Sequence, residues 1–178
     1  MELFEAIEKR HCYRSGFKDI AVPRDTLRKI VEAGLKAPSG CNKQTTEFVI
    51  IDDPDKVREI RAMHAKVKAM QQAQAYIACI VDKNPEPAYQ NFSFEMEDCS
   101  AAVENMLLAI TALGLATVWI DGWLRVEARA EAIGRLIGLP DGKIVRVLLP
   151  IGIPAEEVKG PDKKPFEARA WFNTYGGS

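Results

Sequence analysis

Two arginines four residues apart, Arg10 and Arg14, flank His11 and Cys12 in the segment RHCYR. A guanidinium group is planar and permanently charged, so a pair of them suits a phosphate or another anion. A solvated basic turn is the alternative, and for this pentapeptide alone it is favoured. A catalytic pair of cysteine and histidine is less favoured still, because adjacent side chains do not naturally face one another.

A second segment, APSGCNKQ, offers small residues, accessible backbone and two side-chain amides. Its candidate binding residues are Pro38, Ser39, Gly40, Asn42 and Gln44. A side-chain amide donates and accepts hydrogen bonds at once, which suits the edge of a heterocycle that carries both kinds of group. The alternative is a loop that stops a helix and whose amides satisfy nearby backbone groups. This segment alone favours neither interpretation.

Two further segments combine polar groups with accessible backbone. Asp121 and Gly122 stand at the predicted end of a strand, between two tryptophans, where a glycine lets backbone N–H groups approach a ligand closely. Packing of both tryptophans in a core is the commoner alternative. Lys163 belongs to the basic loop KGPDKK, whose default role is to carry solvated lysines.

The composition is that of a globular protein and argues against several classes of function. The 178 residues include 24 basic and 25 acidic side chains, and a protein held to nucleic acid by counterion release is normally basic. We therefore expect no nucleic-acid partner. The opening residues lack the pattern of a signal peptide, and the most apolar stretch, residues 106–120, is too short and interrupted for a membrane span. The four cysteines form no CxxC pair, so we expect reduced thiols, no metal site and a cytoplasmic location.

Hydrophobic periodicity and turn residues predict one domain over residues 1–178, in which helices and strands alternate and an arm follows at residues 152–178. The first predicted helix ends before Arg10, and the second starts at Pro23 and stops before Pro38. Further helices are predicted at residues 53–69, 94–113 and 127–137, and strands at 47–51, 76–81, 115–120 and 144–151. The arm carries four aromatic side chains, which an untethered tail would not normally hold.

Alternation alone favours a doubly wound parallel sheet. However, no predicted strand is followed by GxGxxG or GxxxxGK[ST], the nucleotide signatures of that architecture. The helix at residues 94–113 has apolar residues nearly all round its axis, which is typical of a helix buried on all sides. It lies either in the centre of one core or between a core and a two-fold interface.

Taken together and in this order, the four segments resemble the nitroreductase family of FMN-dependent oxidoreductases. RHCYR resembles the family's RRSxR-type segment, and APSGCNKQ its APSxxNxQP segment. GLATVWIDGW resembles GLGTCWIGG after a long helix, and PIGIPAEEVKGPDKKPFE resembles GYPxE…RKPxEE. The resemblance covers nearly the whole chain. It implies an α+β three-layer sandwich whose mostly antiparallel central sheet is flanked by helices, and a homodimer with FMN at the subunit interface.

The resemblance also implies roles for single residues. Arg10 and Lys163 match the positions that grip the FMN phosphate, and His11 would lie alongside. Cys12 stands where a hydroxyl donor is usual, so its backbone is the surer contact. Arg14 matches the basic residue near the N1–C2=O edge of the flavin.

Other residues would act from the second subunit or from the strand end. Pro38, Ser39 and Gly40 match the loop that reaches the cofactor from the partner, where Asn42 adds its amide and Gln44 matches the usual glutamine. Asp121 and Gly122 match the pair whose backbone lies by flavin N5. Arg14, Asp121 and Gly122 are therefore the implied catalytic set.

Two departures from the family pattern bear on the substrate. The usual QPW becomes Gln44-Thr45-Thr46, and residues 65–74, where larger members place extra flavin contacts, match nothing in the family pattern. The implied activity moves electrons from NADH or NADPH through the flavin to a small-molecule acceptor, a nitroaromatic compound or a quinone by default. Three alternatives remain: a family reductase acting on a non-nitro substrate, a flavin-binding sensor or store with little turnover, and a structural protein that has lost FMN.

Overall fold

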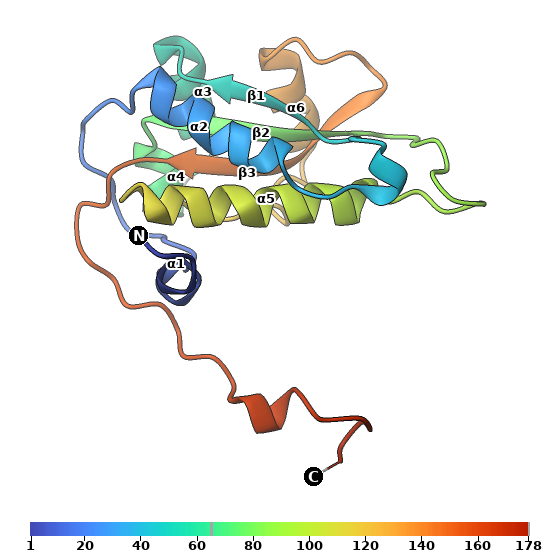
Figure 1. Ribbon diagram of the computed structural model, residues 1–178. Helices are drawn as coiled ribbons and strands as arrows, with labels where there is room; N and C mark the ends of the chain where they lie inside the picture. The colour runs from blue at the N-terminus through green and yellow to red at the C-terminus, as the bar shows by residue number, and fades with distance from the viewer. Residues whose placement is uncertain (65, 178) are drawn as a thin grey trace.

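The structure, a computed structural model, describes residues 1–64 and 66–177 of this α+β protein. Its sheet has the order β1-β2-β3, formed by β1 (Glu47–Ile51), β2 (Ala75–Asp82) and β3 (Lys143–Ile151) (Figure 1). Both neighbouring pairs run antiparallel. The parallel sheet favoured by alternation is therefore wrong, and the antiparallel sheet implied by the family resemblance is confirmed.

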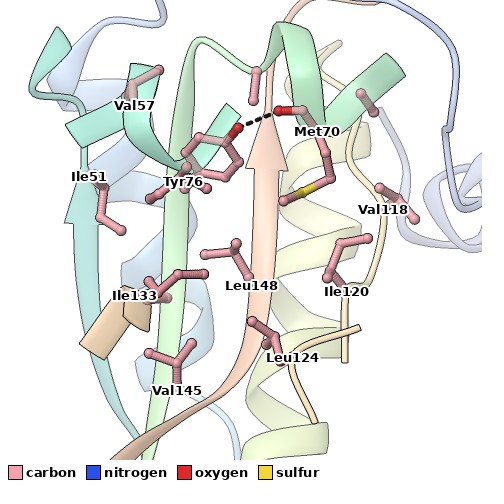
Figure 2. Close-up of a cluster of buried hydrophobic side chains, with 14 of the residues drawn as sticks. Ile51, Val57, Met70, Tyr76, Val118, Ile120, Leu124, Ile133, Val145 and Leu148 are labelled. Carbon is pink, nitrogen blue, oxygen red and sulfur yellow. Dashed lines mark hydrogen bonds between the residues drawn. The ribbon is translucent and has the colours of Figure 1, made fainter. Parts of the chain in front are cut away.

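The central strand β2 is apolar on both faces, and each face supports its own core. Ile77, Cys79 and Val81 face α2 (Arg24–Leu35) and α5 (Glu95–Ala112), which cover one side. Tyr76 and Ala78 face the other side, which is covered by α3 (Pro54–Met63), α4 (Lys68–Gln72) and α6 (Arg129–Leu136). The result is a sheet between two helical layers. Figure 2 shows the second core, where the hydroxyl of Tyr76 donates to the carbonyl oxygen of Met70 in α4.

Helix α5 begins and ends where the sequence predicts, within one residue at each end. After Leu113 the chain turns at Gly114, whose φ is 72°, and Leu115 N–H donates to Ile110 C=O at 3.0 Å. This is the Schellman arrangement, which needs a left-handed residue that glycine supplies without strain. Leu115–Ala116 can therefore turn back along β3.

The strand predicted at residues 115–120 is not formed. Two isolated antiparallel bridges replace it, Ala116 with Gly152 and Ile120 with Leu148, and both lie in one register. That register puts Val118 opposite Pro150, which has no N–H to donate. The ladder beside β3 is therefore interrupted at its centre. The carbonyl oxygen of Thr117, which does not belong to that ladder, accepts a hydrogen bond from Tyr13 N–H.

The helix predicted at residues 53–69 ends at Met63, and α4 is a separate short helix. His64 is extended, with φ −121° and ψ 112°, and its Nδ1 accepts hydrogen bonds from Lys66 N–H and Val67 N–H. The imidazole thus takes backbone donors that a continuous helix would use. The helix predicted at residues 127–137 likewise starts late, because Glu127 and Ala128 have positive φ.

Helix α5 is not buried on every side within this chain. The face against the sheet is buried, whereas Ala112 and Leu113 are exposed and Leu108 and Ala109 are half-buried. Exposed apolar side chains also lie on α1 (Leu3–Lys9), where Phe4 is 82% exposed. The arm runs away from the layers and carries Tyr175, which is 93% exposed (Figure 1).

Candidate functional site

Tyr13 fixes the RHCYR segment against the body of the protein. Its ring is buried and stacks on Phe17 with centroids 5.5 Å apart, and its hydroxyl donates to Gly16 C=O at 2.7 Å. Its N–H donates to Thr117 C=O at 2.8 Å. Because Tyr13 points inward, the next residue, Arg14, is left exposed at the surface. The segment therefore lies beside Thr117, four residues before Asp121.

The structure brings three of the predicted binding residues to one cleft. Arg10, His11 and Lys163 all line a cleft of about 1180 Å³ between α1, the C-terminal end of α5 and the start of the arm. The Arg10 Nε lies 3.1 Å from Glu104 Oε1 on α5, which gives the guanidinium a fixed direction. The arm passes directly over His11, since a Cβ on Gly160 would lie 2.7 Å from the His11 Cβ. Two cations from distant segments thus share a single hollow.

The same cleft holds polar atoms that the described residues leave unused. His11 Nε2 and Thr117 Oγ1 are both buried and have no hydrogen-bond partner there. His11 Nδ1 lies 3.0 Å from Lys9 C=O, so the tautomer that donates at Nδ1 leaves Nε2 as an acceptor. Buried polar atoms without partners cost free energy, which a ligand can recover. The cleft therefore offers a ligand basic side chains and two unpartnered buried polar atoms, beside four carboxylates that also line it, those of Glu8, Glu156, Glu157 and Asp162.

The second group of predicted residues lies elsewhere in the chain. Pro38, Ser39 and Gln44 line a separate hollow of about 120 Å³, and Gly40 and Asn42 belong to η1 (Gly40–Asn42) next to it. This loop packs on the first turns of α5, whereas the Arg10 cleft reaches its last turn at Thr111. Figure 1 shows η1 and α1 near opposite ends of α5. Within one chain the two groups do not form a common site.

Two arginine side chains, those of Arg125 and Arg146, hold the carboxylate of the Asp121-Gly122 pair in place. The Asp121 carboxylate accepts two hydrogen bonds from Arg125, at 2.7 and 2.8 Å, and another from Arg146. Arg146 is the extra residue of a bulge in β3, because Cys79 pairs with Val147 and Ile80 pairs with Val145. A bulge re-aims the side chain that it carries, which here brings the guanidinium to Asp121.

Gly122 itself presents open backbone. It is exposed, and a Cβ added there would meet no atom within 4 Å. The ring of the next residue, Trp123, lies 4.8 Å from the ring of His64, and the Arg129 guanidinium lies 4.9 Å from its centroid. Burial and the neighbouring Arg129 lower the pKa of His64, so this ring is held neutral. The side chains of Asp121 and Trp123 are thus held in place, while Gly122 between them stays accessible.

The two departures from the family pattern have definite places. Thr45 Oγ1 donates to Asp98 at 2.8 Å, and Thr46 lines the small hollow with its Oγ1 buried and without a partner among the described residues. Within the segment 65–74, residue 65 lies outside the described part of the chain. Ala69 and Met70 of α4 are buried, and Ala69 N–H donates to Arg14 C=O at 3.4 Å.

Sequence reasoning missed the residues that hold the predicted ones in place. Glu104, Arg146 and Asp98 contact the binding segments across 94, 25 and 58 residues of chain, respectively. No local pattern marks such partners, because each becomes one only when the fold brings two segments together. Among residues 1–64 and 66–177, no group of three or more His, Cys, Asp or Glu side chains is placed to bind a metal ion. No helix in those ranges is long and apolar enough to cross a membrane.

The chain is similar to known proteins in sequence and in fold. A family model, the nitroreductase family, matches residues 7–77 and 59–153. A protein from Methanothermobacter thermautotrophicus, provisionally named NADH dehydrogenase/NAD(P)H nitroreductase, is 31% identical over 156 residues, which are 88% of this chain and 79% of that protein.

Two crystal structures extend the likeness to the fold. One, from Bacteroides thetaiotaomicron, has the same provisional name, a TM-score of 0.82 and 27% identity, and the match covers 97% of this chain and 98% of that one. The other, a provisionally named nitroreductase from Desulfovibrio desulfuricans in complex with FMN, has a TM-score of 0.78 and 28% identity, with 97% of each chain covered. From its sequence match, its fold and its binding segments, we conclude that this chain belongs to the nitroreductase family of oxidoreductases.

Proposed function

We propose that the protein is an FMN-dependent oxidoreductase that takes electrons from NADH or NADPH and passes them to a small-molecule acceptor, a nitroaromatic compound or a quinone by default. The observation that carries this proposal is the cleft in which Arg10, His11 and Lys163 meet beside two unpartnered buried polar atoms. FMN combines a phosphate dianion with a chain of hydroxyl groups, so its chemistry fits this set of donors and acceptors. The FMN complex of the Desulfovibrio relative supports the same choice.

In this scheme the cations hold the phosphate end of the flavoprotein's cofactor. Arg10 and Lys163 would make charge-assisted hydrogen bonds to phosphate oxygens, and the ion pair with Glu104 restrains the Arg10 side chain. His11 Nε2 and Thr117 Oγ1 offer hydrogen bonds to hydroxyl groups. Cys12 contributes through its backbone, because a thiol is a weak donor.

The redox end depends on Arg14 and on the strand-end pair. FMN, when bound, supplies the hydride and electron chemistry itself. The family resemblance puts Arg14 near the flavin edge that becomes more negative on reduction, where its positive charge would favour the reduced form. The Asp121-Gly122 backbone stays accessible because Arg125 and Arg146 restrain the carboxylate next to it. No protein group needs to abstract a proton for this step.

We further propose a homodimer in which each site takes residues from both chains. Pro38, Ser39, Gly40, Asn42 and Gln44 would then complete the site of the partner subunit. Support comes from the distance between the two groups, since Asp98 and Thr111 alone are separated by about 20 Å of helix. The exposed apolar side chains on α1 and the arm, among them Phe4 and Phe172, provide surface for a second copy to cover.

The test is extraction of the bound cofactor followed by stopped-flow reduction of the flavin with NADH and with NADPH. We expect FMN to be released on denaturation without a covalent link, and at least one nucleotide to bleach the flavin absorbance rapidly. Steady-state turnover with a panel of nitro compounds and quinones then separates an enzyme from a sensor or store. A protein that binds no FMN after reconstitution would refute the proposal.

A further inference from the structure

The loop of residues 38–46 is held in an unusual backbone shape. Three of its non-glycine residues, Cys41, Asn42 and Gln44, have left-handed φ values of 50°, 54° and 52°. Side chains with a Cβ rarely adopt this region, so each such residue costs free energy. Strained conformations persist only where surrounding contacts determine them, and they gather at binding sites. The question is which contacts hold this one.

The main contact is a buried carboxylate on α5. Asp98 is only 6% exposed, and its two oxygens each accept a hydrogen bond from the loop. Oδ1 accepts from Gly40 N–H at 2.8 Å, and Oδ2 accepts from the Thr45 hydroxyl at 2.8 Å. One side chain thus joins the two ends of the strained turn. An ionised carboxylate accepts stronger hydrogen bonds than a neutral group does.

Two further contacts leave the loop little freedom. The Ser39 hydroxyl accepts from Gln44 N–H at 2.9 Å, which closes the turn from inside. Gly40 lies against the Phe94 ring so closely that an added Cβ would stand 2.4 Å from Phe94 Cδ2. The loop therefore fits against the start of α5 in one position, and Asp98 is the charged element of that fit.

We propose that Asp98 is a positioning residue that, together with Thr45, holds the 38–46 loop in the shape that binds the flavin of the partner subunit. This role rests on the proposed function, because the loop is a binding element only if FMN binds. It also gives Thr45 a purpose: where the family pattern has proline, this chain has a hydroxyl donor for Asp98. In this chain the hydrogen bond from Thr45 restrains the end of the loop.

The experiment uses the full-length protein stripped of flavin and titrated with FMN, with binding followed by quenching of flavin fluorescence. Asp98→Ala removes both acceptors, and we expect the FMN dissociation constant to rise about tenfold to a hundredfold. Asp98→Asn keeps an amide oxygen for Gly40 N–H and an N–H for the Thr45 oxygen, so its constant should stay within about threefold of wild type. Ser100→Ala, on the exposed side of the same helix, is the matched control and should change nothing.

Thr45 provides a second and gentler series. Thr45→Val has nearly the same shape but no hydroxyl, and we expect its FMN dissociation constant to rise about threefold to tenfold. Thr45→Ser restores the donor and should restore the affinity. This pair decides the question if Asp98→Ala does not fold. Light scattering checks that each variant keeps the wild-type mass, so that a lost partner is not mistaken for a misplaced loop.

Hydrogen exchange separates positioning from simple stabilisation. In the flavin-free protein, peptides covering residues 38–46 should exchange faster in Asp98→Ala than in wild type, while peptides from β2 should not. A purely structural Asp98 would lower the unfolding temperature and leave the dissociation constant, measured well below that temperature, unchanged. Wild-type binding with unchanged affinity in Asp98→Ala would overturn this role alone. Failure of the wild-type protein to bind FMN would instead overturn the proposed function, and this role with it.

Discussion

The charge of Arg10 is the single feature on which the assignment of the phosphate end depends most. Its guanidinium pairs with Glu104, and Arg10 lines the cleft that Lys163 also lines. A charge-assisted hydrogen bond contributes about 1.5–3 kcal/mol. Removing this one group should therefore affect FMN and not riboflavin, which lacks the phosphate.

We expect Arg10→Ala to weaken FMN binding by about tenfold to a hundredfold and to leave riboflavin binding nearly unchanged. Fluorescence titration with both flavins makes the comparison. Arg28→Ala, on the exposed face of α2, is the control for loss of one positive charge. Equal losses for both flavins would place Arg10 away from the phosphate.

Arg14 is expected to tune the flavin more than to hold it. Its exposed guanidinium contacts Cys12 C=O at 3.5 Å and is otherwise available to a ligand edge. A fixed cation favours the redox state with more negative charge. Arg14→Ala should make the midpoint potential of the bound flavin more negative, and Arg14→Lys should shift it less. An unchanged potential in a dye-linked reductive titration of Arg14→Ala would remove this role.

His64 links the site to pH through its lowered pKa. The ring is buried beside Trp123 and faces the positive charges of Arg129 and Lys66, which favour its neutral form. In the unfolded chain the pKa returns to its ordinary value of 6.5. As the pH falls below that value, the unfolded state binds a proton that the folded state does not bind. The free energy of unfolding therefore decreases as the pH falls.

We therefore expect the unfolding temperature to drop between about pH 6.5 and the lower pKa of the folded state, and to drop less in His64→Gln. Thermal unfolding followed by circular dichroism at several pH values measures both slopes. The protein has only two histidines, so His11→Gln is the matched control. If the unfolding temperature depended on pH in the same way in wild type and His64→Gln, another group would be responsible for the loss of stability at low pH.

At the scale of elements, a close approach joins the N-terminal segment to Gly152, the residue that follows β3. Gly152 is buried, and a Cβ added there would lie 2.4 Å from Cγ of the Phe17 ring and 2.8 Å from its Cβ. Phe17 also forms an isolated antiparallel β-bridge with Pro154. An aromatic ring packed from both sides has little room to move aside.

Gly152→Ala should consequently destabilise the protein by about 1–3 kcal/mol, the usual cost of overpacking. Chemical denaturation of the variant beside Gly142→Ala, where an added Cβ meets no atom within 4 Å, isolates the steric part. A loss no greater than that of the control would mean that Phe17 repacks freely.

The same comparison of elements shows what the sequence could and could not predict. Helices α2 and α5 were predictable because a neighbouring residue marks a limit of each: Pro23 precedes α2, and Gly114 follows α5. Strand 115–120 was overpredicted because its apolar pattern is real, while its interruption depends on Pro150, some thirty residues away, standing opposite Val118. The helix break at His64 likewise depends on where an imidazole nitrogen points. Among the predicted binding residues, Arg10, His11 and Lys163 line one cleft. Their role in binding and the sharing of a site between two chains both stay predictions.

At the scale of the whole molecule, that prediction has a direct test in mixed dimers. Co-expression of an Arg10→Glu chain with an Asn42→Ala chain gives heterodimers in which one site is intact and the other is doubly damaged. If Arg10 and Asn42 act across the interface, purified heterodimers should bind about half the wild-type amount of FMN. Sites built within single chains would leave every site damaged, and occupancy would then stay at the level of the homodimeric variants.

Residues 13–18 are hydrogen-bonded to residues 152–156, and these bonds can form only late in the synthesis of the chain. Lys18 N–H donates to Ile153 C=O at 2.9 Å, Ala155 N–H donates to Gly16 C=O at 3.0 Å, and the Tyr13 hydroxyl reaches Glu156 C=O across 143 residues. Ribosomes deliver the N-terminal partners of these bonds first, at about 5–20 residues per second, and the C-terminal partners almost last. Residues 13–18 therefore lack the segment on which they dock for most of synthesis. Nascent chains stalled before residue 152 should accordingly be unable to retain flavin, however well their helices have already formed.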